Sequence, residues 1–300
     1  MTSFLVAGVD GSDSSLQAAD WAADEALLHD LPLRLVYASK WQHYEGAALA
    51  GSLSRPDGKV LADNIVGSTA ERLRRRAPEL LVTTDVQDKD PVGALLSEGR
   101  QAFALVTGTR GRGEIPGLLL GSVSLAVAAG AHCPTVVVRG DEAGLDGTHG
   151  RVLLGIGDAD LDSPAVRFAF TEARLRRCTL DVVRAWRCPA HESTDHPLLA
   201  ADPDRDHQER ASALLEEALA AAAHDHPDVP VHRITAEGPA RKALLRHSAA
   251  ADLLVVGARR RHSQFGMQLG RVAHTLLHHA DCPVAVVPGS SPRPSQGGTP

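Results

Sequence analysis

The chain carries one sequence pattern twice. The stretch Phe4–Ser39 aligns without a gap to Arg151–Trp186, a shift of 147 residues, and near the two ends Cys133-Pro134 aligns to Cys282-Pro283 at a shift of 149. A change of only two residues in the shift across a whole repeat indicates a duplication with loop-sized differences. The 300 residues also match two domains of ordinary size, so we expect two copies of one fold.

Each half alternates the signals of strands and helices. Phe4–Val9 is a continuous apolar run, as expected of a strand buried on both faces of a sheet. Ser12–Ser15 then offers helix-capping side chains before an amphipathic helix. Five strands joined by helical crossovers in each half predict a parallel, doubly wound sheet. The other predicted elements are strands at Leu33–Ala38, Leu80–Val86, Leu105–Gly108 and Thr135–Val138 and near Val231, Leu253 and Val284, with helices at about Lys59–Arg76, Ser122–Ala131, Arg205–His224 and Pro239–Ala249 and a short one from Asp90-Pro91.

Composition shifts mark the domain boundaries. The predicted first domain covers residues 1–140 and the second covers 151–288, with a short flexible linker at 141–150 that is rich in glycine. The segment 289–300 is rich in proline, glycine and serine, so we expect a disordered tail. Because equivalent domains from a duplication usually pack about a pseudo-two-fold axis, the two halves are expected to pack as such a pair, and a homodimer of chains stays open.

Charge and hydropathy exclude several classes of protein. The formal net charge of −6 argues against a protein that coats nucleic acid, and no stretch approaches 18 uninterrupted apolar residues, so no membrane span is expected. The first residues lack the charged region of a signal peptide. The four cysteines form no CxxC pair and are expected to be reduced. A cytoplasmic location follows as an expectation.

Two loops follow predicted strands at the sheet edge where such folds bind ligands. One is Val9–Ser12, after the first strand, and the other is the glycine-rich stretch Gly108–Gly113, after the fourth. Ligands of doubly wound sheets lie at the carboxyl ends of the strands, where the strand order reverses. Glycines allow backbone N–H groups to approach a phosphate closely, and the start of a helix at Ser122 adds further donors. Asp10 can accept a hydrogen bond from a ribose hydroxyl or an adenine amino group.

The spacing of these residues resembles that of a known family. Gly108-xx-Gly111-x9-Gly121-Ser122 is similar to the G-2x-G-9x-G-(S/T) nucleotide loop of the universal stress protein family, and it precedes a CPTVVV closing strand as in that family. GVDGS after the first strand also matches, and the likeness covers nearly the whole chain as two tandem domains. The resemblance implies Rossmann-like domains of the adenine nucleotide alpha hydrolase-like type. It further implies an often dimeric ATP-binding regulator of stress responses, and it admits Mg²⁺ with the ATP. Since the family tends to pair through its fifth strand, the resemblance also implies that Thr135–Val138 and Val284–Val287 meet within one chain.

The family's site can be carried over residue by residue. The resemblance places Gly8 and Asp10 at the first strand and Val36 beside the adenine. It places the backbone of 108–113 around the phosphates, and 121–124 on their far side. The resulting nucleotide-binding residues are Gly8, Asp10, Val36, Gly108, Thr109, Arg110, Gly111, Arg112, Gly113, Gly121, Ser122 and Ser124.

The second half departs from this pattern where a ligand would bind. Gly157 stands in place of Asp10, although Asp158 is a neighbouring substitute, and Arg260 and Arg271 replace the second glycine and the serine of the loop. A side chain at Arg260 obstructs the close approach of backbone to phosphate, although arginine can bind anions directly. We therefore expect the second domain to bind ATP weakly or not at all.

Other function classes find less support in the sequence. No GxxxxGK[ST] loop and no HxGH or SGGxDS motif is present, so neither an efficient ATPase nor a nucleotidyl-transferring enzyme is expected, and no catalytic residue is assigned. His274 and His278 share a helix face, but no nearby cysteine or carboxylate set completes a metal site, and no metal is expected. A scaffold for protein contacts, with nucleotide structural or absent, remains the alternative to a regulator; no residue identifies the protein partner.

Overall fold

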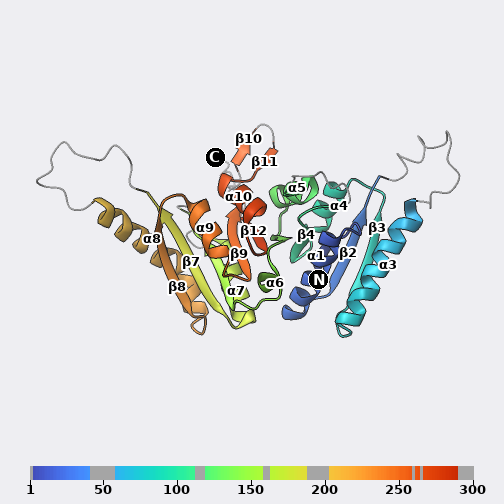
Figure 1. Cartoon of the computed structure of the whole chain (residues 1–300), viewed down its shortest axis with the longest axis horizontal. Coiled ribbons are helices and arrows are strands. Elements are labelled where there is room, and N and C mark those ends of the chain that lie inside the picture. The colour runs from blue at the N-terminus through green and yellow to red at the C-terminus, as the bar shows by residue number, and fades with distance from the viewer. Residues whose placement is uncertain are drawn as a thin grey trace, which may run out of the picture.

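The computed structural model forms one ten-stranded sheet flanked by helices (Figure 1). It describes residues 3–40, 58–111, 119–157, 163–187, 203–258, 261–263 and 266–289. The first half contains β1 (Leu5–Gly8), α1 (Asp13–Leu28), β2 (Leu33–Ala38), α3 (Gly58–Arg76), β3 (Val82–Gln87), α4 (Pro91–Glu98), β4 (Ala104–Gly108), α5 (Ser122–Gly130) and β5 (Thr135–Val138). The second half contains β6 (Arg151–Gly155), α7 (Pro164–Arg176), β7 (Thr179–Trp186), α8 (Pro203–Asp225), β8 (Val231–Glu237), α9 (Ala240–Ser248), β9 (Leu253–Ala258), β10 (Arg261–Ser263), β11 (Gly266–Gln268), α10 (Arg271–His279) and β12 (Val284–Pro288).

The sheet confirms the predicted duplication and its pseudo-two-fold packing. Its strand order is β3-β2-β1-β4-β5-β12-β9-β6-β7-β8, so the two halves mirror each other about the β5–β12 junction. In this sheet all pairings within each half are parallel, whereas β12 runs antiparallel to β5, with Ala285 opposite Val136. In each half the strand order reverses beside the first strand. In the first half this switch point lies between β1 and β4, where ligand binding is expected.

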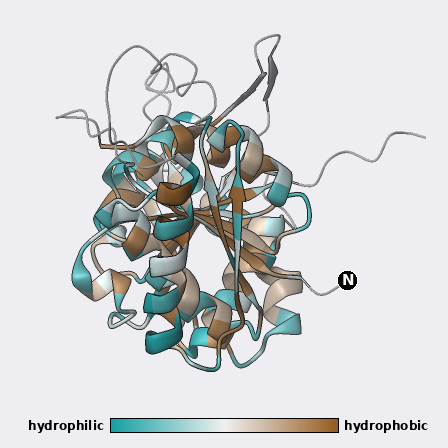
Figure 2. Ribbon diagram, turned by 90° about the vertical axis from the view of Figure 1, so that its right-hand side faces the viewer, coloured by the Kyte–Doolittle hydropathy of each residue, from teal (hydrophilic) through white to brown (hydrophobic). Residues whose placement is uncertain are grey.

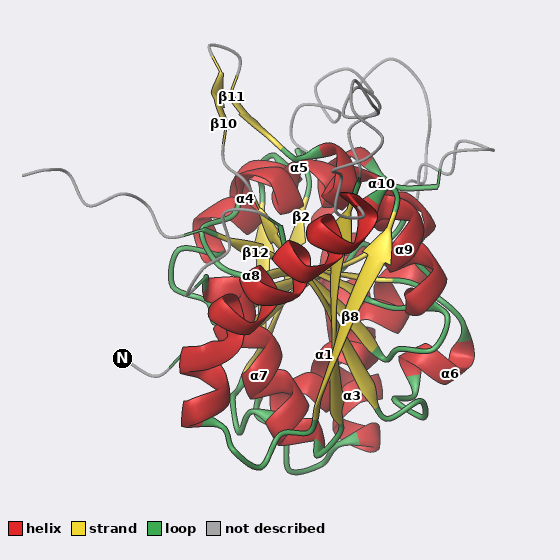
Figure 3. Ribbon diagram, turned by 90° about the vertical axis from the view of Figure 1, so that its left-hand side faces the viewer, coloured by secondary structure: helices red, strands yellow, loops and turns green. Residues whose placement is uncertain are grey.

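Helices cover both faces of the sheet, as Figure 3 shows. On one face, α1, α3, α7 and α8 share an apolar core that runs through both halves. On the other face, α9 and α10 share a core with α5, and α4 packs with α5 over β1 and β4. Figure 2 shows the strands coloured mainly as hydrophobic, which agrees with their burial on both faces. With few aromatic side chains, these cores consist mostly of alanine, valine and leucine.

Local sequence signals explain where several helices begin. The hydroxyl of Ser12 accepts a hydrogen bond from Ser15 N and caps α1. The carboxylate of Asp90 accepts from Gly93 N and caps α4, whose first residue is a proline. Ser163 caps α7 in the same way. Serine and aspartate at the N-cap satisfy backbone N–H groups that have no partner within the helix, so these starts are fixed locally.

The connection between the halves is packed against the second half. It contains one helical turn, α6 (Glu142–Leu145), which is capped by Asp141. Asp141 N donates to Asp281 O, and a Cβ on Gly140 would lie 2.3 Å from that same carbonyl oxygen. Gly140 has φ +109°, a backbone conformation that favours glycine. Beyond residue 289, the predicted tail lies outside the described residues.

A helix needs about 20 mostly apolar residues to cross a bilayer. None of the helices in the described part of the chain is both long and apolar enough to do so.

Candidate functional site

A cavity of about 710 Å³ opens at the switch point of the first half, at the carboxyl ends of β1, β2 and β4. This volume lies within the range of roughly 300–1,000 Å³ that is typical of small-molecule sites. Most of the residues predicted to bind a nucleotide line it together: Gly8, Asp10, Val36, Gly108, Arg110, Gly111, Gly121, Ser122 and Ser124. The structure therefore brings to one place residues that are more than 100 positions apart in the chain.

Three of the predicted residues are not among the described residues that line this cavity. Arg112 and Gly113 lie outside the described residues. Thr109 is described, but its side chain faces α1, where its Oγ1 lies 3.1 Å from the hydroxyl oxygen of Ser14. Its carbonyl accepts a hydrogen bond from Gly121 N at 2.6 Å. Thr109 thus holds the two ends of the glycine loop together and belongs to its framework.

Asp10 is held in place at the end of β1. Its Oδ1 accepts hydrogen bonds from Ser12 N at 3.0 Å and from Ser12 Oγ at 2.6 Å. A Cβ on Gly111 would lie 2.5 Å from Asp10 Oδ2, closer than real Cβ contacts allow. The absence of a side chain at Gly111 therefore lets the loop after β4 pass directly over the carboxylate. This contact explains in physical terms why GVDGS and the glycine loop occur together.

Gly108 and Gly121 differ in how much room the neighbouring atoms leave for a side chain. A Cβ on Gly108 would lie 2.4 Å from the backbone oxygen of Ser14, so this glycine is required by the close packing of β4 on the start of α1. A Cβ on Gly121 would meet its nearest neighbour, the carbonyl oxygen of Thr109, at 3.4 Å, which is ordinary contact distance. Within the described part of the chain, packing does not exclude a side chain at Gly121. The glycine leaves the backbone open toward the cavity that it lines.

The start of α5 supplies polar groups to the cavity. Ser122 is the first residue of the helix and is exposed, so its hydroxyl and the free N–H groups of this turn are available to a ligand. Ser124 is buried, and its hydroxyl donates to Gly108 O at 2.7 Å, which ties α5 to the end of β4. The hydroxyl of Thr107, also in the lining, is buried with no hydrogen-bond partner within the described part of the chain. These features fit the phosphate and sugar oxygens of a nucleotide.

Several cavity residues were missed by the sequence analysis. They come from the start of α1, from the carboxyl end of β2, from α4 and α5, and from α10 of the second half: Ser15, Tyr37, Ala38, Ser39, Pro91, Leu95, Val123, Leu125, His274 and His278. The β2 residues adjoin Val36 and could have been found from their place at the strand end. Nothing in the local sequence places α10 beside a site in the other half, since that depends on the β5–β12 junction.

The second half differs from the first at the equivalent place. Arg184, which aligns with the cavity-lining Tyr37, is 6% exposed and donates from Nη1 to Gly157 O at 3.0 Å. Its guanidinium therefore lies against the backbone of the residue that replaces Asp10. The loop that would hold phosphates instead carries the β10–β11 hairpin, whose second strand lies against α5 of the first half. Asp158 and Arg260 lie outside the described residues.

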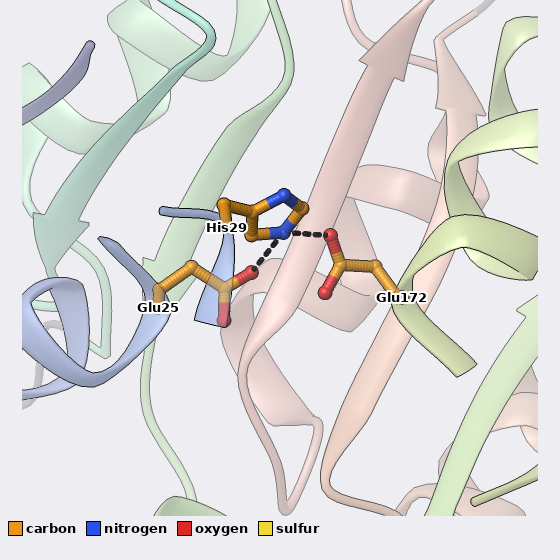
Figure 4. Close-up of side chains that lie close together, drawn as sticks. All are labelled: Glu25, His29 and Glu172. Carbon is orange, nitrogen blue, oxygen red and sulfur yellow. Dashed lines mark hydrogen bonds and ion pairs between the residues drawn. The ribbon is translucent and has the colours of Figure 1, made fainter. Parts of the chain in front are cut away.

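A buried cluster of charged side chains lies where α1 meets α7 (Figure 4). His29 Nε2 is 2.9 Å from Glu172 Oε1 and 3.5 Å from Glu25 Oε1. Arg176 forms ion pairs with both glutamates, at 3.3 Å to Glu172 Oε2. At the shift of 147 residues, Glu25 is the equivalent of Glu172 and His29 of Arg176, so the cluster straddles the pseudo-two-fold axis.

The cluster balances its own charge. Burial alone would lower the pKa of His29, but hydrogen bonds with Glu172 and Glu25 raise it to about 9. Burial opposes ionisation of Glu25 as well, yet the charge of Arg176 brings that pKa down to about 2. For Glu172, burial and the neighbouring charge of Glu25 raise the pKa to about 7. The three ligand atoms of Glu25, His29 and Glu172 lie within 4.8 Å of one another, a spacing that a metal could use, but Arg176 and protonated His29 already supply the positive charge.

Raising the pH is expected to destabilise the protein through His29. A pKa raised in the folded state contributes stability that is complete below the ordinary value of 6.5 and is lost as the pH rises through about 9. Above that pH, two carboxylates face a single guanidinium. We expect the free energy of unfolding to fall by up to about 3 kcal/mol between pH 7 and pH 10, measured by urea unfolding. In His29→Gln this part of the pH dependence should vanish; an identical profile in both proteins would contradict the prediction.

Comparisons with known proteins agree with this architecture. The family model described as the universal stress protein family matches residues 1–139 and 148–288. A universal stress protein of Mycobacterium tuberculosis is 34% identical over 289 residues, covering 94% of this chain and 96% of the relative. One of Mycolicibacterium smegmatis is 31% identical over 288 residues, with the same coverage. A crystal structure of a universal stress protein from Archaeoglobus fulgidus has the same fold, with a TM-score of 0.65 at 18% identity, covering 95% of this chain and 97% of that one. Because the family match extends over both halves, the chain belongs to the universal stress protein family.

Proposed function

We propose that the chain binds one ATP in the cavity of its first half and acts as a nucleotide-dependent regulator of a stress response. The observation that carries the proposal is the convergence of Asp10, the glycine loop and the start of α5 on one cavity at the switch point of the sheet. Each part suits a different portion of a nucleotide. Asp10 suits hydroxyl or amino donors, and the backbone of the loop and of α5 suits phosphate oxygens.

In this proposal the adenine lies toward β2 and the phosphates toward α5. Val36 is 2% exposed and lines the cavity with Tyr37 and Leu95, which gives that end apolar walls. Arg110, Ser122 and the loop glycines lie between the end of β4 and the start of α5, and β1 separates β4 from β2 in the sheet. Bound nucleotide would order the loop between β4 and α5 and so change the surface that a partner meets. If Mg²⁺ accompanies ATP, the phosphates themselves supply its ligands, since no carboxylate other than Asp10 is among the described lining residues.

We propose a binding protein and not an enzyme. Hydrolysis of ATP requires a positioned metal and a group that orients the attacking water. Among the described lining residues, Asp10 is the only acidic side chain, and its Oδ1 is engaged by Ser12. Any hydrolysis would accordingly be slow.

We expect the protein to bind one adenine nucleotide per chain. Nucleotide released from the purified, denatured protein should be identified by mass spectrometry, and stripped protein should be titrated with ATP, AMP and cyclic AMP by calorimetry. We expect one site because Gly157 and Arg184 alter the equivalent place in the second half. Two equivalent sites would overturn the proposed role of the second half. Finding no adenine nucleotide, and no heat on adding any of them, would overturn the proposed function.

A protein-contact scaffold is the alternative function. A cellular test separates the two, because a scaffold that needs no nucleotide keeps its cellular role when the site is impaired. We expect Asp10→Ala, which weakens ATP binding, to impair the stress response of cells that carry the variant. A scaffold would keep that response although ATP binding is weakened.

A further inference from the structure

The cavity of the first half is lined by two side chains of the second half. His274 and His278 lie one turn apart on α10, with their ring centroids 4.6 Å apart, and both are among the cavity's lining residues. The proposed site is therefore composite. Neither histidine belongs to the nucleotide loop of its own half, which precedes α10.

The two histidines lie on the side of the cavity that the phosphates are proposed to occupy. In the sheet order, β2 is separated from the second half by β1, β4 and β5, so the apolar end at Val36 lies far from α10. The helix α5, by contrast, contributes to the same apolar core as α10, because Ala128 of α5 and Leu120 just before it belong to the cluster that contains Leu276 and Leu277. Since α5 begins at the glycine loop, α10 faces the end of the cavity that offers donors to anions.

The chemistry of these side chains suits an anion. His278 Nε2 is buried and has no hydrogen-bond partner within the described part of the chain. Burial, together with the positive surroundings of His274, His279 and Arg139, lowers the pKa of His278. A neutral imidazole still donates one N–H, and a nearby phosphate would favour a second proton. A ligand oxygen would thus give an unsatisfied buried group its missing partner.

We infer that His274 and His278 donate hydrogen bonds to the phosphate groups of the nucleotide bound in the first half, so that the second half completes the site. This inference rests on the proposed function, since it requires a nucleotide in the cavity. It assigns the second half a role in binding although its own loop has lost the nucleotide pattern. It also couples ligand binding to the junction between the halves, because the histidines are held by α10.

The duplication itself supplies the substitutions for a test. At the shift of 149 residues, the first-half equivalents of His274 and His278 are Leu125 and Ala129. The double variant His274→Leu/His278→Ala therefore places in α10 residues that an equivalent helix already accepts. His279→Ala is the matched control, since His279 is exposed on the same helix and is not among the lining residues.

The experiment compares ATP with adenosine on the full-length protein, stripped of nucleotide, by calorimetric titration at fixed pH and salt. For the double variant we expect the affinity for ATP to fall by about tenfold or more, the usual effect of losing a hydrogen bond to a charged group, while adenosine binds within about twofold of the wild type. Unchanged adenosine binding also shows that the variant is folded. His279→Ala should bind both ligands as the wild type does.

The possible failures are distinguishable. If the wild type binds ATP and the double variant binds it equally well, the inference is wrong and the proposed function stands. If ATP and adenosine weaken equally, the histidines act only through packing, and the inference is again wrong. If the double variant does not fold, His274→Gln/His278→Gln decides: glutamine keeps a donor, so this variant should retain more ATP affinity than His278→Ala, and equal loss in both would count against the inference. Absence of binding by the wild type overturns both claims.

Discussion

Replacing Asp10 with alanine is expected to weaken ATP binding by about 10- to 100-fold, the range for a hydrogen bond to a charged group. The carboxylate lines the cavity at the end of β1, and it is the acceptor proposed for the ribose or adenine donors. It also accepts hydrogen bonds from Ser12 N and Ser12 Oγ, so its removal frees the turn that leads into α1. Calorimetric titration of the stripped variant with ATP measures the effect.

The matched control for Asp10→Ala is Asp13→Ala. Asp13 is exposed in the first turn of α1, three residues along the chain, and is not among the lining residues. Both substitutions remove one negative charge from the same region, so a general electrostatic effect on a polyanionic ligand would appear in both. We expect only Asp10→Ala to lose affinity. Equal affinity in Asp10→Ala and the wild type would place the ligand elsewhere.

Replacing Arg176 with methionine is expected to lower the free energy of unfolding by about 3–5 kcal/mol, the usual effect of leaving a buried charge without its partner. Arg176 is the cation paired with both Glu25 and Glu172, which are 4% and 0% exposed. Without it, His29 alone would face two buried carboxylates. The guanidinium carbon also lies 5.9 Å from the ring centroid of Trp21. Urea unfolding followed by circular dichroism measures the loss of stability, since the fluorescence of the chain's three tryptophans would not report on Trp21 alone.

Two further variants test the reason for this loss. Arg174→Met removes an exposed arginine from the same helix and should change the stability by no more than about 0.5 kcal/mol. The double variant Glu172→Gln/Arg176→Met removes one charge of each sign and should recover part of the loss, because Glu25 and His29 remain as a balanced pair. If the double variant were less stable than Arg176→Met alone, charge balance would not be the cause.

The fold could be predicted largely from the sequence because its signals are local. The strand at Thr135–Val138 was placed to the residue, and the helix expected at about Lys59–Arg76 is observed at Gly58–Arg76. Strand positions follow from apolar runs and helix starts from capping residues, and neither requires knowledge of distant contacts. The duplication predicted that the two halves pack about a pseudo-two-fold axis, and the family resemblance predicted that they meet through their last strands, as β5 and β12 do.

The candidate site was predicted less completely. The glycine spacing predicted a set of loop residues, but it did not separate Gly108, where packing on Ser14 excludes any side chain, from Gly121, where no described neighbour does. It also did not show that the side chain of Thr109 faces Ser14, which leaves the backbone of Thr109 for the predicted contact with a ligand. These distinctions depend on interatomic distances in the folded protein, where a difference of less than 1 Å decides whether a side chain fits. A spacing pattern does not contain that information.

The sequence by itself determined that this chain is two copies of one α/β domain, and that only the first keeps a complete nucleotide loop. Those properties follow from residue types and spacing within each half. Only the tertiary structure decided that Glu25 meets its own equivalent Glu172 in a buried cluster, and that His274 and His278 line the cavity of the other half. Both contacts cross the pseudo-two-fold axis. They depend on how the β5–β12 junction orients α1 against α7 and α5 against α10, and no local sequence pattern encodes an orientation between two packed domains.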